Sequence, residues 1–121
     1  MARNVVVLEK DPNLARNIAG GLGSHFSVHL TATHEELRDH VSRTCPQAVV
    51  INIEVWRLSD IESLHQEFPG LPIVCTHRVP DEEMWMAALH AGASDVCPAD
   101  DARNVLTAVL RNTADPRSAA A

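Results

Sequence analysis

The residue types at the ends of three apolar runs decide which chemistry this sequence can perform. Asn52 closes the run from Ala48 to Ile51, where an α/β domain would hold its reactive group, and Glu9, Lys10 and Thr76 follow two further runs. Forming an acyl phosphate requires a carboxylate nucleophile, whereas a carboxamide offers only an acceptor oxygen and two N–H donors. Mg²⁺ is attracted by carboxylates together with a phosphate, so one carboxylate beside an ammonium is a poor site for that ion. These residues predict a hydrogen-bonding role for Asn52.

The chain alternates between short apolar runs and amphipathic stretches. The runs are rich in β-branched residues and bounded by charge or Pro, which is typical of strands buried on both faces of a parallel sheet. Right-handed crossovers then favour an α/β fold in which helices cover both faces of a five-stranded sheet. The predicted strands are Val5 to Leu8, Phe26 to Leu30, Ala48 to Ile53, Ile73 to Cys75 and Asp95 to Cys97, of which the second and the last have the weaker pattern.

A helical pattern follows each of these strands. Pro12 marks the start of the first helix, the capping pair Thr33 and Glu36 marks the second, and Asp100 or Asp101 opens the fifth. The apolar faces predicted to pack on the sheet are Leu14, Ile18 and Leu22; Leu37 and Val41; Leu58, Ile61 and Leu64; Met86 and Leu89, with Ala93 beyond them; and Val105, Leu106 and Val109.

The composition is that of a single globular domain. The 121 residues are 45% apolar, which predicts one domain over residues 1–113 and a tail, or the start of a linker to an effector domain, over 114–121. A net charge of −6 argues against nucleic acid or an anionic membrane surface as partner. The apolar runs are too short to cross a bilayer and no signal-peptide layout is present, so we expect a cytoplasmic protein. Three cysteines without ligand spacing fit a reduced compartment.

In the order and spacing of its segments, the sequence resembles the receiver domain of bacterial response regulators over about residues 3 to 112. The pieces that carry the resemblance are VVVLEKDP at the first strand, PQAVVINI at the third, LPIVCTH at the fourth and ALHAGASDV before the fifth. The resemblance implies the flavodoxin-like doubly wound fold with strand order 2-1-3-4-5. It also implies a regulatory role in two-component signal transduction.

The same resemblance locates a phosphorylation pocket, most of whose functional groups are absent. The metal-binding acidic pair falls on Glu9 and Lys10, the phosphoacceptor aspartate on Asn52, the hydroxyl that follows the phosphoryl group on Thr76, and the pairing lysine on Ala99. Of these, Thr76 alone matches, and the ammonium of Lys10 would stand where the metal's charge stood. We therefore expect an atypical pseudo-receiver, which is not an enzyme, holds no metal or cofactor, and acts by protein–protein interaction without phosphorylation.

Alternatives remain open for this degenerate pocket. Asn52 either fixes one conformation by linking to Lys10, Glu9 or Thr76, or it reflects neutral drift in an unused site. A second alternative is phosphorylation by an unconventional route, including slow deamidation of Asn52 to aspartate. A third is a sensor for a small ligand in the altered pocket beneath Trp56, a residue that could instead anchor its own loop.

Apolar residues follow Asp81 to Glu83 in the fourth helical pattern. If Met86 and Leu89 face the sheet, Trp85 and Met84 lie on the flank or outer face, because adjacent helical residues diverge by about 100°. Trp and Met are favoured at recognition surfaces, although Trp85 could instead cover the core. The resemblance implies an output and dimer face on the fourth helix, fifth strand and fifth helix. The candidate interface for a protein partner, an attached effector domain or a homodimer is Met84, Trp85, Val96, Arg103 and Thr107.

His77 is the remaining polar residue near the predicted pocket mouth, where a histidine could titrate near neutral pH. Metal binding by His77 with Cys75 or Cys97 would need ligands on one face, and adjacent strand residues point apart. We expect Cys75 and Cys97 to be small core side chains on neighbouring strands.

Overall fold

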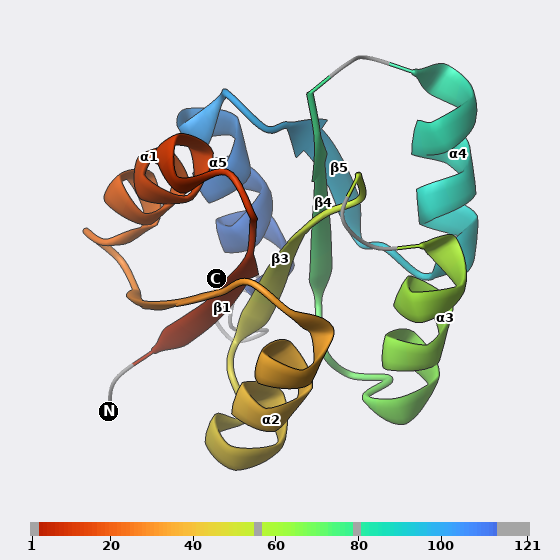
Figure 1. The fold of residues 1–121 in the computed structure, drawn as a ribbon, viewed down its shortest axis with the longest axis horizontal. Coiled ribbons are helices and arrows are strands. Elements are labelled where there is room, and N and C mark those ends of the chain that lie inside the picture. The colour runs from red at the N-terminus through yellow and green to blue at the C-terminus, as the bar shows by residue number, and fades with distance from the viewer. Residues whose placement is uncertain (1–2, 55–56, 79–80, 114–121) are drawn as a thin grey trace, which may run out of the picture.

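The computed structural model describes residues 3–54, 57–78 and 81–113, in which strand and helix alternate five times (Figure 1). Each predicted strand and helix is present. The expected tail 114–121 and Trp56 lie outside the described residues. The strands are β1 (Asn4–Leu8), β2 (Ser27–Thr31), β3 (Ala48–Asn52), β4 (Ile73–His77) and β5 (Asp95–Pro98). The helices are α1 (Pro12–Leu22), α2 (His34–Thr44), α3 (Leu58–Glu67), α4 (Glu82–Ala91) and α5 (Ala102–Thr113).

All five strands form one parallel sheet in the order β2-β1-β3-β4-β5, which confirms the order implied by the resemblance. Helices α1 and α5 cover one face, and α2, α3 and α4 cover the other (Figure 1). The central strands are buried on both faces, which explains their continuous apolar sequence. Each fully buried Val, Leu or Ile side chain contributes about 1.5–3 kcal/mol relative to an exposed one.

Side-chain caps begin the helices where the sequence signals lie. The hydroxyl of Thr33 accepts a hydrogen bond from the backbone N–H of Glu36 at 3.2 Å, as the capping pattern predicts. Asp101, rather than Asp100, caps α5, because its carboxylate accepts from the backbone N–H of Asn104 at 3.0 Å. A cap of this kind is worth about 1 kcal/mol to its helix.

The predicted orientation of α4 is wrong. Met86 is 55% exposed and Leu89 38% exposed, whereas Ala88 is buried against the sheet. The reason is that α4 carries an unbroken apolar sequence from Met84 to Leu89, which covers every side of a helix that turns about 100° per residue. Such a sequence gives no period from which to choose the inner face, and the small alanine allows the closest approach to the sheet.

The strand ends differ slightly from the prediction. β4 continues through His77, so Thr76 lies within the strand rather than beyond it, and Asn52 is the last residue of β3. Over the described part of the chain, no helix combines the length and apolar character that a bilayer span requires.

Candidate functional site

The carboxyl ends of β1, β3 and β4 bring the predicted polar residues together. Asn52 on β3 is in register with Thr76 on β4, and Glu9 directly follows β1, the neighbour of β3 on its other side. All three side chains are buried. In doubly wound sheets this edge is where ligands bind, so the structure places Glu9, Asn52 and Thr76 at the expected site.

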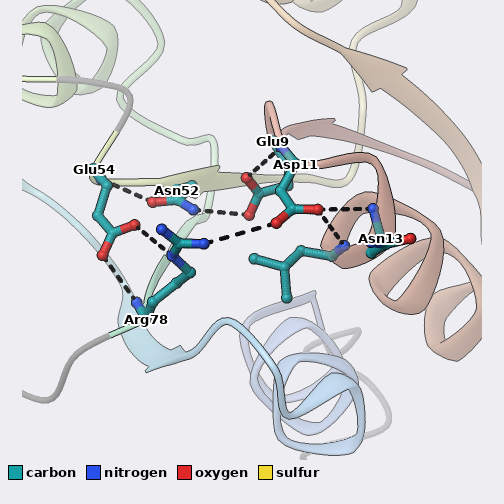
Figure 2. A network of polar contacts seen from close by, with 7 residues as sticks. Glu9, Asp11, Asn13, Asn52, Glu54 and Arg78 are labelled. Carbon is teal, nitrogen blue, oxygen red and sulfur yellow. Dashed lines mark hydrogen bonds and ion pairs between the residues drawn. The ribbon is translucent and has the colours of Figure 1, made fainter.

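Asn52 is hydrogen bonded through both the nitrogen and the oxygen of its carboxamide. Its Nδ2 donates to Glu9 Oε1 at 2.8 Å, and its Oδ1 accepts from the backbone N–H of Glu54 at 2.8 Å (Figure 2). The second oxygen of Glu9 accepts from the backbone N–H of Asp11 at 3.2 Å. Of the three partners considered for Asn52, the structure shows Glu9. The amide therefore has a structural role, because it satisfies a buried carboxylate without a metal ion.

Arg78, in the loop after β4, is the residue that sequence reasoning missed. Its Nε lies 3.3 Å from Glu54 Oε2, and one terminal guanidinium nitrogen lies 3.7 Å from Asp11 Oδ2 (Figure 2). Its backbone N–H also donates to Glu54 Oε1 at 3.3 Å. Arg78 thereby connects the loops that follow β1, β3 and β4. In the sequence, the only sign of this role is a basic residue two places beyond Thr76. A single loop residue belongs to no periodic pattern, so its contacts could not be predicted.

Lys10 lines the same cavity, but its side chain is exposed and it forms no ion pair within the described residues. The cation that lies between carboxylates here is Arg78, not Lys10. The ion pairs of Arg78 are themselves largely exposed, and pairs of this kind are worth about 0–1 kcal/mol each. The importance of Arg78 lies in where it puts a positive charge, beside two carboxylates that line the pocket, Asp11 and Glu54.

Thr76 and Ala99 contribute no polar contact through their side chains. The Thr76 hydroxyl is buried and has no hydrogen-bond partner within the described residues, so the expected pocket hydrogen bond of Thr76 is not found. Ala99 is also buried, and only its backbone N–H is engaged, donating to the carbonyl of His77 at 2.8 Å. No ammonium therefore reaches the pocket from the end of β5.

The donor set of this pocket does not fit Mg²⁺. Both oxygens of Glu9 and the oxygen of Asn52 are already hydrogen bonded, and a guanidinium lies across Asp11 and Glu54. Mg²⁺ requires oxygen ligands in near-octahedral geometry and usually keeps several of its own waters. The cavity holds about 180 Å³, below the roughly 300–1,000 Å³ that is usual for small-molecule pockets.

The candidate interface residues differ in exposure. Met84 and Trp85 are partly exposed on α4, and Arg103 and Thr107 are exposed on α5. Val96 is only 3% exposed, so its side chain cannot contact a partner, and its inclusion was wrong. It is buried because β5 packs under α4, with Val96 in the same core cluster as Ala88. The exposed residues that the prediction left out are Met86 and Leu89.

Trp85 also contacts the neighbourhood of the pocket. Its ring lies 6.0 Å from the ring of His77, measured between centroids, in a tilted arrangement. His77 is buried at the end of β4, next to Thr76. The indole is therefore held from one side, while 38% of the residue remains exposed.

Cys75 and Cys97 are buried on neighbouring strands, as predicted, and they lie on opposite faces of the sheet. Burial raises the pKa of the Cys75 thiol to about 12 and that of Cys97 to about 11. Among the described residues, no three His, Cys, Asp or Glu side chains are grouped to hold a metal ion.

Comparison with solved structures places this geometry in a known fold. A response regulator from Thermotoga maritima matches with a TM-score of 0.85 at 17% identity, over 95% of this chain and 100% of that one. A CheY-like receiver domain protein from Methanospirillum hungatei matches with a TM-score of 0.80 at 15% identity, over 93% and 94% of the two chains. This is the receiver-domain fold.

A third match is to a longer protein. NtrX from Brucella abortus, crystallised with ADP, matches with a TM-score of 0.82 at 19% identity, over 99% of this chain but 29% of that one. No protein-family model matches the sequence, and no curated protein matches it significantly. The likeness establishes the fold.

Proposed function

We propose that this chain is a pseudo-receiver: a regulatory module of signal transduction that acts by binding another protein or an attached effector domain, and that is not switched by aspartyl phosphorylation. One observation carries the proposal. The side chain that ends β3 is a carboxamide that donates to Glu9 at 2.8 Å, in the place where the chemistry needs a nucleophilic carboxylate.

The remaining groups of the site support the same conclusion. A transferred phosphoryl group needs fixed positive charge to stabilise its oxygens, and the end of β5 supplies only the methyl group of Ala99. The guanidinium of Arg78 is already shared between Glu54 and Asp11. Nucleophile, metal site and cation are thus changed together, which favours a site built for stability rather than for transfer.

Two other functions receive less support. Deamidation of Asn52 would require attack by the backbone nitrogen of Ile53 on the carboxamide carbon. That nitrogen donates to the carbonyl of Thr76 at 2.9 Å, and both ends of the carboxamide are hydrogen bonded. A small-ligand sensor would need more room than the cavity of about 180 Å³ provides.

The nature of the partner follows from charge and from the matched structures. A net charge of −6 disfavours nucleic acid and anionic membranes. The match to a segment of the longer NtrX is consistent with a chain that works beside an effector domain. The alternative to such a partner is association of two copies through α4 and α5, to which α5 would contribute the exposed Arg103 and Thr107.

The experiment is incubation with acetyl phosphate and Mg²⁺, followed by intact mass measurement. We expect no phosphate adduct on the wild-type chain. A variant that combines Lys10→Asp, Asn52→Asp, Arg78→Gln and Ala99→Lys serves as the matched control, because it restores the carboxylates and the ammonium and removes the competing guanidinium. A phosphate adduct on the wild-type protein would overturn the proposal.

A further inference from the structure

The outer face of α4 is an apolar surface without a cover in the described structure. Four of the five large apolar side chains that the described residues expose, Met84, Trp85, Met86 and Leu89, lie on this helix. Three of them, Trp85, Met86 and Leu89, line a depression of about 810 Å³. Exposed apolar side chains gathered in this way mark interaction sites, whereas single ones are ordinary.

Carboxylates border one end of this depression. Glu82 and Glu83 lie in the first turn of α4 and line the depression together with the apolar residues. Neither forms a salt bridge within the described part of the chain. Their negative charge interacts favourably with the N-terminus of the helix. Because neither is in a salt bridge among the described residues, both carboxylates are available to a partner's cation. The surface is therefore apolar along its length and acidic at its start.

We propose that this α4 surface binds an amphipathic helix of a partner protein, one whose apolar side chains are flanked by Lys or Arg. The proposal rests on the proposed function and names the partner's chemistry. An apolar stripe at i, i+3 and i+4 spacing fits the depression lined by Trp85, Met86 and Leu89. Lys or Arg at its border would meet Glu82 and Glu83.

Two features of the surface support a partner of this kind. Methionine is flexible and polarisable, so Met86 can fit apolar side chains of varied shape. Trp85 is held against His77 and loses little freedom on binding, which favours it as an anchor. A second copy of the chain fits less well, because it would bring the same carboxylates of Glu82 and Glu83 towards this acidic edge.

Calorimetric titration with a synthetic amphipathic helical peptide of Leu and Lys tests the proposal. We expect saturable binding that Met86→Gln weakens by about tenfold or more, as for a central interface residue. Glu83→Lys should weaken binding as well, and added salt should reduce the difference between this variant and the wild type. A peptide in which Glu replaces each Lys should not bind.

Matched controls separate this surface from general attraction to an acidic protein. Leu30→Gln removes an exposed apolar side chain from β2, far from α4 in sequence, and Glu35→Lys makes the same charge change at the second residue of α2 as Glu83→Lys makes in α4. Both controls should bind the Leu/Lys peptide as the wild type does. Equal losses in the controls, or no binding by the wild type, would overturn the proposal.

Two further outcomes are informative. If light scattering shows dimers that Met86→Gln dissociates, the occupant is a second copy and the proposal is wrong. The proposed function fails by a different result, a phosphate adduct in the acetyl phosphate experiment. Absence of peptide binding together with absence of an adduct therefore overturns only the inference about the α4 surface.

Discussion

Asn52 and Glu9 form a buried hydrogen-bonded pair in which the amide, rather than a metal ion, satisfies the carboxylate. The carboxamide donates to the buried carboxylate at 2.8 Å and accepts from the backbone of Glu54, so each polar atom it engages is satisfied from within the chain. An aspartate in the same place would face Glu9 with no donor between the two carboxylates. With an NH₂ group in place of one oxygen, the site thus needs no further donor or cation beside Glu9.

Asn52→Asp should destabilise the protein. We expect a loss of about 1–3 kcal/mol in the free energy of unfolding near neutral pH, because a buried hydrogen bond becomes a contact between like charges. The loss should shrink at acidic pH, where one of the two carboxyls takes up a proton. Urea unfolding of Asn52→Asp and of Asn17→Asp, the same change at an exposed position of α1, measures the difference. Equal stability of the two variants would contradict the account.

The buried hydroxyl of Thr76 allows a second test with a matched residue. Thr76→Val removes a hydroxyl that has no partner within the described residues, so it should leave the free energy of unfolding unchanged or raise it by about 1 kcal/mol. Thr31→Val removes a buried hydroxyl that donates to the Val7 carbonyl at 2.8 Å and should cost about 1 kcal/mol. Thermal or urea unfolding compares them. A larger cost at Thr76 would show that its hydroxyl is bonded.

At the scale of the elements, β1, β3 and β4 could be predicted because each is a short run rich in β-branched residues, whereas β2 and β5 have a weaker pattern. Because these strands are parallel, their carboxyl ends meet at one edge of the sheet, which is enough to predict that Glu9, Asn52 and Thr76 lie at that edge. Helix α4 could not be oriented, since its unbroken apolar sequence from Met84 to Leu89 fits any face. Arg78 could not be predicted either, because its role depends on how three loops meet.

The packing of β4 and β5 predicts how stability changes at alkaline pH. Burial raises the pKa of Cys75 to about 12, against 9.0 for an unperturbed thiol. The unfolded chain therefore loses this proton first, so the contribution of this thiol to stability is fully present below pH 9 and is lost as the pH rises towards 12. Urea unfolding between about pH 8 and pH 10 should show the loss, and Cys75→Ala should reduce it. Cys45→Ala, which removes an exposed thiol, should leave the dependence of the free energy of unfolding on pH unchanged. The same dependence in the wild type and in Cys75→Ala would contradict this prediction.

The whole molecule combines the receiver-domain fold with a strand-end site whose polar groups bond to one another. Solved structures that are 15–19% identical match this fold with TM-scores of 0.80–0.85, so the fold does not require a closely similar sequence. The polar side chains Glu9, Asn52 and Thr76 gather at the strand ends, where the scaffold does not need a particular chemistry. The loops that follow β1, β3 and β4 are connected there through Arg78.

Amide NMR of the labelled protein, titrated with Mg²⁺ and beryllofluoride as a phosphoryl mimic, tests the central claim most directly. We predict no saturable shift for Glu9, Asn52 or Thr76, because the site has neither a nucleophilic carboxylate nor free ligands for the ion. The same titration of the variant that combines Lys10→Asp, Asn52→Asp and Ala99→Lys with Arg78→Gln provides the control, in which we expect saturable shifts. Saturable shifts at these residues in the wild-type protein would contradict the account.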